Sequence, residues 1–191
     1  MKVITLNSIQ FDQTVDQLSD KCSSFNPDVV IGILNGGSYV GKRIIQNNLF
    51  IKKKYYEVKL QRESTAKKES KLFPLVVKSL PYFITNMLRV YEAKKLAKKE
   101  RNHSNEFHIN VPELASSDKK ALIVDDAIDS GETMQKICIK MKEKYPDLII
   151  KTACVVCTTD NPVVLPDYQL YDQVLVRFPW SSDYKGKDRF V

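Results

Sequence analysis

The stretch that decides the fold reads Ala121-Leu122-Ile123-Val124-Asp125-Asp126-Ala127-Ile128-Asp129-Ser130-Gly131-Glu132-Thr133. Its apolar start predicts a buried β-strand that ends at Val124, and the residues from Thr133 to about Lys144 predict a helix. Because ligands of parallel α/β folds bind at the carboxyl ends of the strands, Asp125 and Asp126 are expected at a binding edge. Two adjacent carboxylates repel each other, and sugar hydroxyls or a divalent cation would supply the partners they need.

The turn between this strand and the helix, residues 127–133, combines a glycine with two hydroxyl side chains. Free backbone N–H groups and the positive end of the helix dipole make such a turn a cradle for an anion. The alternative is a structural corner in which Asp125 and Asp129 only cap backbone amides. A structural corner has no need of two consecutive acids after a buried strand, which favours the binding site.

The same stretch resembles the phosphoribosyl pyrophosphate signature of the type I phosphoribosyltransferases. In that signature a hydrophobic strand leads to two acids, two small or apolar residues, Asp, Ser or Thr, Gly, any residue and Thr. The resemblance implies catalytic roles for Asp125 and Asp126, which would hold the ribose hydroxyls and, directly or through those hydroxyls or water, Mg²⁺. It implies that Asp129 handles a proton on the base. The loop that would wrap the 5′-phosphate comprises Ala127, Ile128, Ser130, Gly131, Glu132 and Thr133.

A glycine turn follows the apolar strand predicted for residues 29–34, and a helix is predicted for residues 39–46. Asn35, Gly36 and Gly37 resemble the pyrophosphate loop of the same family, where glycines let backbone amides approach phosphate oxygens. Taken alone the motif is only a turn, but it stands in the right place in the order of elements. Asn35 replaces the Arg or Lys that many members carry. Mg²⁺ and the nearby Lys42 and Arg43 are expected to compensate.

The segment Arg177-Phe178-Pro179-Trp180 resembles the closing Phe-Pro-Trp of the xanthine–guanine branch of purine phosphoribosyltransferases. This resemblance implies a hood over the base, in which Trp180 either contacts the base or is a core anchor. Tyr168 or Tyr171 could stack on the base in place of the aromatic residue that this branch carries. Two residues depart from the branch: Thr158 stands where a lysine meets the exocyclic oxygen of the base, and Leu175 where an aromatic ring stacks on it. A non-purine acceptor therefore stays open.

The middle of the chain is basic, since residues 52–101 contain fifteen Lys or Arg against five Asp or Glu. Such a patch would attract a polyanionic substrate or nucleic acid, although a solvated helix face explains most of these lysines. Within it we predict a helix whose buried stripe is Ile84, Leu88 and Tyr91. We interpret residues 61–112 as a flexible-loop and helical insertion, and its helix could serve dimerisation.

Strands that alternate with helices predict an α/β fold with a parallel sheet flanked by helices. Further predicted elements are a helix over residues 11–25 and strands over residues 49–60, 149–157 and 173–178. The 191 residues fit one domain with a small hood formed by the terminal segments, in which residues 158–191 take part. No apolar run is long enough to span a membrane and the N-terminus lacks a signal-peptide pattern, so we expect a cytoplasmic protein.

The resemblance implies a Mg²⁺-dependent transferase of nucleotide metabolism, active in purine salvage. It would move a phosphoribosyl group from phosphoribosyl pyrophosphate to a ring nitrogen of a purine or purine-like base and work as a homodimer without nucleic acid. Two alternatives stay open: the same sugar site with a non-purine acceptor, and a non-catalytic sensor of phosphoribosyl pyrophosphate that binds nucleic acid. Retention of Asp129 favours catalysis.

Overall fold

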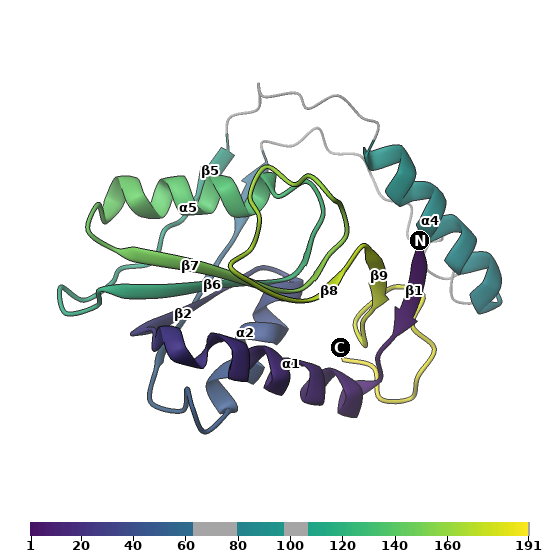
Figure 1. The fold of residues 1–191 in the computed structure, drawn as a ribbon, viewed down its shortest axis with the longest axis horizontal. Helices are drawn as coiled ribbons and strands as arrows, with labels where there is room; N and C mark the ends of the chain where they lie inside the picture. Colours follow the sequence, from purple (N-terminus) through teal and green to yellow (C-terminus); the bar gives the residue numbers. More distant parts are fainter. Residues whose placement is uncertain (63–79, 98–106, 191) are drawn as a thin grey trace.

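The computed structural model describes residues 1–62, 80–97 and 107–190. Its centre is a five-stranded sheet in the order β3-β2-β6-β7-β8, in which all neighbouring strands are parallel (Figure 1). The strands are β2 (Val29–Ile33), β3 (Lys54–Val58), β6 (Lys120–Ile128), β7 (Ile149–Cys157) and β8 (Tyr168–Asp172). The parallel α/β fold predicted from the sequence is confirmed.

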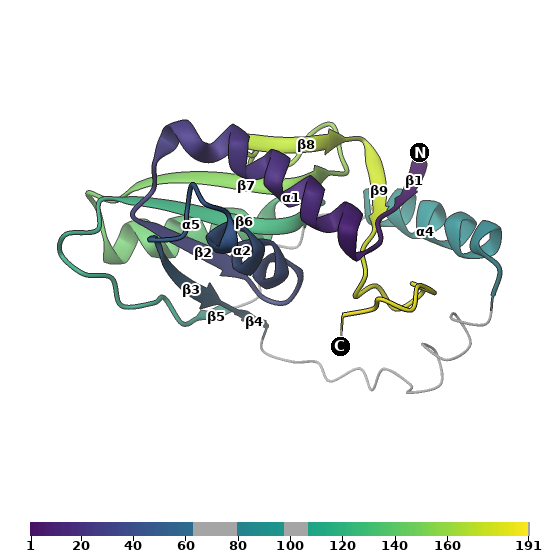
Figure 2. The same ribbon diagram turned by 90° about the horizontal axis from the view of Figure 1, so that it is seen from below.

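Helices cover both faces of this sheet. The helices α1 (Ser8–Cys22) and α2 (Gly36–Gln46) lie on one face, and α5 (Glu132–Lys144) lies on the other (Figures 1 and 2). Side chains of a strand alternate between the faces, so Leu122 and Val124 contact the first layer while Ile123 contacts the second. Because both faces are buried, β6 reads as a continuous apolar run until it reaches its acids.

A second, smaller sheet joins the two ends of the chain. The strand β1 (Lys2–Thr5) pairs in parallel with β9 (Val174–Arg177). The helix α4 (Tyr82–Ala97) lies beside this pair (Figure 1) and contacts it through side-chain hydrogen bonds. We call β1, β9, α4 and residues 178–190 the hood region.

Four strands were not predicted from the sequence, namely β1, β8 and the two that follow. β4 (Leu60–Arg62) and β5 (Phe107–Ile109) form an antiparallel pair that brings the two ends of the middle segment together. The strand predicted over residues 49–60 is also shorter than expected, because residues 47–53 form turns in which Phe50 N–H donates to the Asn47 carbonyl at 2.8 Å. Residues 63–79 and 98–106 of the predicted insertion, with part of its basic run, lie outside the described residues.

The buried stripe predicted for the middle helix is wrong at Leu88 and Tyr91, which are 42% and 67% exposed. Ile84, its third residue, is half-buried, and the neighbouring Thr85 is 1% exposed. Polar side chains of α4 contact the rest of the protein instead, because Thr85 and Asn86 accept hydrogen bonds from the buried Arg177. Across the three ranges that the structure describes, no helix has the length and apolar character needed to cross a lipid bilayer.

Candidate active site

The paired acids belong to the last part of β6, because this strand continues to Ile128 and does not end at Val124 as predicted. Asp125 lies opposite Cys154 of β7, and the backbone N–H of Asp126 donates to Asp125 Oδ1 at 2.9 Å. Burial, followed by the negative charge of Asp126, raises the pKa of Asp125 well above that of an ordinary aspartate. Burial also raises the pKa of Asp126. A site of this kind favours ligands that bring hydroxyl protons or positive charge.

The glycine turn lies directly against these acids. A Cβ atom added to Gly36 would collide with the Asp126 carboxylate, and one added to Gly37 would come within 2.6 Å of the Val124 carbonyl oxygen. The two glycines are the first residues of α2, which therefore begins earlier than the predicted Tyr39. A cis peptide bond joins Leu34 to Asn35 before them. The two motifs, far apart in the sequence, thus meet at one edge of the sheet, and the absence of side chains on the glycines lets them meet.

The turn after β6 reaches the same edge and leads into α5, which begins at Glu132. Gly131 has a φ of 79°, a left-handed conformation that favours glycine. Val163 N–H donates to the Ser130 carbonyl at 2.8 Å, so the loop that follows β7 holds the turn. Of the predicted phosphate-loop residues, the structure places Ser130, Gly131, Glu132 and Thr133 here, at the amino end of a 13-residue helix whose dipole favours an anion. The other two, Ala127 and Ile128, are the last residues of β6.

Asp129 has a neighbour that sequence analysis missed. Thr158 Oγ1 donates to Asp129 Oδ1 at 2.5 Å, and the Thr158 backbone N–H donates to the Ile128 carbonyl at 2.9 Å. Thr158 is 8% exposed whereas Asp129 is exposed, so a buried hydroxyl orients an accessible carboxylate. The sequence could have predicted this contact, because Thr158 directly follows β7, whose carboxyl end lies beside that of β6.

The compensation expected from Lys42 and Arg43 is wrong. Lys42 Nζ lies 2.8 Å from a carboxylate oxygen of Glu57, and Arg43 forms ion pairs with Asp12 and Asp16 at 3.3 and 2.6 Å. Both cations sit beyond the first turn of α2 and contact acids of β3 and α1. They are therefore engaged away from the paired aspartates.

Trp180 reaches the site, but through a polar contact. Its Nε1 donates to Asp126 Oδ2 at 3.3 Å. The indole ring stacks on Tyr39 and Phe178, with ring centroids 4.6 and 4.7 Å apart. The flat surface expected to meet a base is thus engaged by aromatic rings of the protein.

Tyr168, whose contact with the base stays a prediction, lies two strands away from the paired acids. It is the first residue of β8, opposite Ala153, and Lys151 Nζ lies 5.4 Å from its ring centroid. Since parallel strands bind ligands at their carboxyl ends, its position at the beginning of β8 sets it back from the acids. Tyr171 lies nearer that edge, opposite Val156. Leu175 pairs with Val3 in the small sheet.

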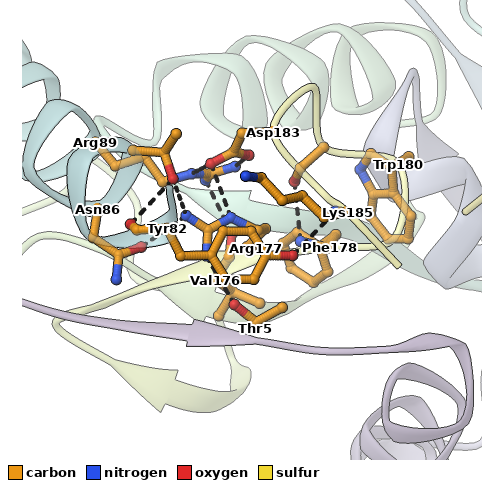
Figure 3. A network of polar contacts seen from close by, with 12 residues as sticks. Thr5, Tyr82, Asn86, Arg89, Val176, Arg177, Phe178, Trp180, Asp183 and Lys185 are labelled. Atoms are coloured by element: carbon orange, nitrogen blue, oxygen red, sulfur yellow. Dashed lines mark hydrogen bonds and ion pairs between the residues drawn. The ribbon is translucent and has the colours of Figure 1, made fainter. Parts of the chain in front are cut away.

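A buried network of charges holds the hood region together (Figure 3). Arg177 is 1% exposed, and its guanidinium donates to Asp183 Oδ2 at 2.8 Å, Thr5 Oγ1 at 2.8 Å and Asn86 Oδ1 at 2.7 Å. Arg89 of α4 pairs with the same Asp183. Burial alone would raise the pKa of Asp183, but the hydrogen bonds and charges of the two arginines outweigh it and lower this pKa to about 2. Asp183 therefore stays charged and joins α4 to the segment that carries Trp180.

Comparisons with known proteins agree with this geometry. The family described as the phosphoribosyl transferase domain matches residues 9–183. A comparison with curated proteins finds no match. A purine phosphoribosyltransferase from Pyrococcus horikoshii shares 20% identity, with 95% of both chains covered and a TM-score of 0.64.

Two other solved structures have the same fold. A xanthine-guanine-hypoxanthine phosphoribosyltransferase from Helicobacter pylori shares 14% identity, with 95% of both chains covered and a TM-score of 0.65. A hypothetical protein from Neisseria gonorrhoeae, solved with bound ppGpp, shares 15% identity over 94% of this chain and 89% of that one, with a TM-score of 0.58. Since the family match spans nearly the whole chain and its two glycine-bearing motifs meet at one sheet edge, the chain belongs to the phosphoribosyl transferase domain family.

Proposed function

We propose that this protein transfers a phosphoribosyl group from phosphoribosyl pyrophosphate to a ring nitrogen of a purine or purine-like base and releases pyrophosphate. One observation carries the proposal: Gly36 lies so close to the Asp126 carboxylate that no side chain fits between them. The predicted pyrophosphate loop and the predicted ribose acids are thereby neighbours, as a single extended sugar phosphate would require.

The chemistry follows from the groups at this edge. Positive charge builds on the ribose as the bond to pyrophosphate breaks, so Asp125 and Asp126 would stabilise the ring while they hold its hydroxyls. Backbone N–H groups at the start of α5 would bind the 5′-phosphate. Asp129 would accept the proton of the incoming nitrogen, with its carboxylate oriented by the hydroxyl of Thr158.

The same acids could bind Mg²⁺ partly through ribose hydroxyls or water molecules. Among the residues that the structure describes, no group of three or more His, Cys, Asp and Glu could hold a metal ion by itself. Asp125 and Asp126, whose pKa values are raised, would gain from a nearby cation and would hold it partly through ribose hydroxyls or water. When bound, Mg²⁺ offsets the charge of the departing pyrophosphate, a task that Lys42 and Arg43 do not perform.

Two residues bear on whether the acceptor is a purine. Thr158 hydrogen-bonds Asp129 at the position where the xanthine–guanine branch carries a lysine, and Leu175 lies within the small sheet. These two residues favour a second candidate, the same transfer to a non-purine acceptor. A sensor that binds nucleic acid would instead use the basic middle segment. A cytoplasmic homodimer with α4 at its interface stays a prediction.

One assay separates these candidates. The protein is incubated with Mg²⁺, phosphoribosyl pyrophosphate and a panel of hypoxanthine, guanine, xanthine, adenine, uracil and orotate, and pyrophosphate release is followed. We expect release with at least one purine, and loss of turnover with retained sugar binding in Asp129→Asn. Asp147→Asn, an exposed acid beyond the far end of α5, is the matched control. Release with a pyrimidine alone would favour the second candidate, and binding without release would favour the sensor.

A further inference from the structure

We propose that Trp180 is a positioning residue for Asp126, whose indole N–H holds one carboxylate oxygen of this acid and connects the sugar site to the hood region. The hydrogen bond is present in the structure, and only its effect on substrate binding and kinetics rests on the proposed function. Trp180 would thus act through Asp126 and not by stacking on the base.

The hydrogen bond is the first observation behind this proposal. Trp180 Nε1 lies 3.3 Å from Asp126 Oδ2, and Gly36 leaves no room on the α2 side for a side chain that could take over this role. An indole N–H can only donate and a carboxylate accepts, so the pair is chemically matched. Because a hydrogen bond to a charged group is among the stronger ones, it restricts the orientation of the carboxylate.

The second observation is that the indole is itself fixed. It stacks on Tyr39 of α2 with an angle of 18° between the ring planes, and on Phe178 with an angle of 5°. Phe11 of α1 meets it edge to face at 5.0 Å between ring centroids. These rings come from three separate segments, so the plane of the indole is set by packing before any ligand binds.

The third observation links Trp180 to α4. Phe178 N–H donates to Ser181 Oγ at 3.0 Å, which closes a short turn around Trp180. The residues on either side of this turn, Arg177 and Asp183, belong to the buried charge network that contains Arg89 of α4 (Figure 3). The position of the indole N–H over Asp126 is therefore supported by the whole hood region.

The contact can be tested without any ligand, because Trp180 is the only tryptophan of the chain. A ¹H–¹⁵N spectrum then contains one indole N–H resonance. We expect this resonance to shift upfield in Asp126→Ala, where its acceptor is gone. Asp125→Asn is the matched control, since it removes a neighbouring charge but leaves an acceptor for the Asp126 backbone N–H. An indole resonance that moves no further in Asp126→Ala than in Asp125→Asn would overturn the proposal.

The positioning role is tested by two substitutions of Trp180. Trp180→Phe keeps a ring to stack on Tyr39 and Phe178 but loses the N–H, whereas Trp180→Leu loses both. We expect about tenfold weaker binding of phosphoribosyl pyrophosphate with Mg²⁺ by calorimetry in Trp180→Phe, with an unchanged KM for the base. Wild-type affinity in Trp180→Phe would show that Trp180 only packs, and a raised KM for the base alone would show a base contact; either result overturns the proposal. If the wild type binds no phosphoribosyl pyrophosphate, the proposed function fails while the spectroscopic test still decides the contact.

Discussion

The sheet edge and the hood region of this protein are built in opposite ways. The edge takes Asp125 to Glu132 from one continuous stretch and adds the glycines that follow β2, so it consists of two short motifs, each of them continuous in the sequence. The hood region joins Thr5, Arg89 and Arg177 through Asp183, and these residues come from both ends and the middle of the chain. Short local motifs thus form the proposed site, whereas ion pairs between distant residues hold the segment that carries Trp180.

The largest effect is expected when the hood network is broken at its centre. Asp183→Ala leaves two arginines without their shared partner, and Arg177 is almost fully buried. Removing one partner of a buried ion pair costs about 3–5 kcal/mol, so the free energy of unfolding in urea should fall by that amount. The double variant Arg177→Met, Asp183→Leu should recover part of the loss. An unchanged unfolding midpoint in Asp183→Ala would mean that the network does not hold the hood region.

The pKa of Asp183 gives this region a pH dependence of known sign. Because the folded-state pKa is lowered to about 2, the contribution of Asp183 to stability is complete above its ordinary pKa and is lost as pH falls through the folded value. We expect wild-type stability to decline between about pH 4 and pH 2, and Asp183→Ala to show a shallower decline. Thermal unfolding recorded across this range provides the measurement.

At the sheet edge, the contact of Gly36 with Asp126 is the sharpest feature. Gly36→Ala would force the new methyl group against the carboxylate and displace the acid or the start of α2. Since a displacement of about 1 Å at a reacting centre can cost about 100-fold, we expect kcat/KM to fall by about that factor while the fold persists. Gln46→Ala, at the exposed far end of α2, is the control and should keep wild-type kinetics. Wild-type activity in Gly36→Ala would show that the close contact between the two motifs is not needed for activity.

A smaller effect is expected at the edge of β7. Thr158→Val keeps the shape of the side chain but removes the hydroxyl that donates to Asp129. We expect kcat to fall about tenfold, the scale of one hydrogen bond to a charged group, with no change in the affinity for phosphoribosyl pyrophosphate. Thr158→Ser restores the donor and should restore most of kcat. Equal kinetics in the Val and Ser variants would show that the hydroxyl does not orient Asp129.

The smallest effect is expected at Tyr168, which the structure sets back from the acids. Tyr168→Leu should change the KM for the base by less than about twofold, because its ring contacts Lys151 and packs against the core. A large rise in this KM would show that Tyr168 contacts the base.

The sequence predicted the sheet edge well because each element there has a local signal. The apolar runs of β2, β6 and β7 and the glycines between them fixed the strands and their turns, and β7 was predicted with its observed bounds. The strands β1, β4, β5 and β8 were missed, since each contains only three to five residues and gains stability from pairing with another segment of the chain. The buried side of α4 was misjudged for the same reason: its anchor Arg89 is paired with an acid 94 residues away. The ion pairs of Lys42 and Arg43 also depend on residues of other elements, which no local pattern reveals.

We propose that Asp125 and Asp126, with the turn that follows them, form a site for a ribose ring that carries a phosphate. Calorimetric titration of the whole chain with phosphoribosyl pyrophosphate and Mg²⁺ tests it most directly, with the double variant Asp125→Asn, Asp126→Asn as the comparison. We expect saturable binding to the wild type and binding at least tenfold weaker in the double variant, since two charged hydrogen-bond acceptors are lost. Equal affinity of the two proteins, or a wild type that binds nothing, would contradict it.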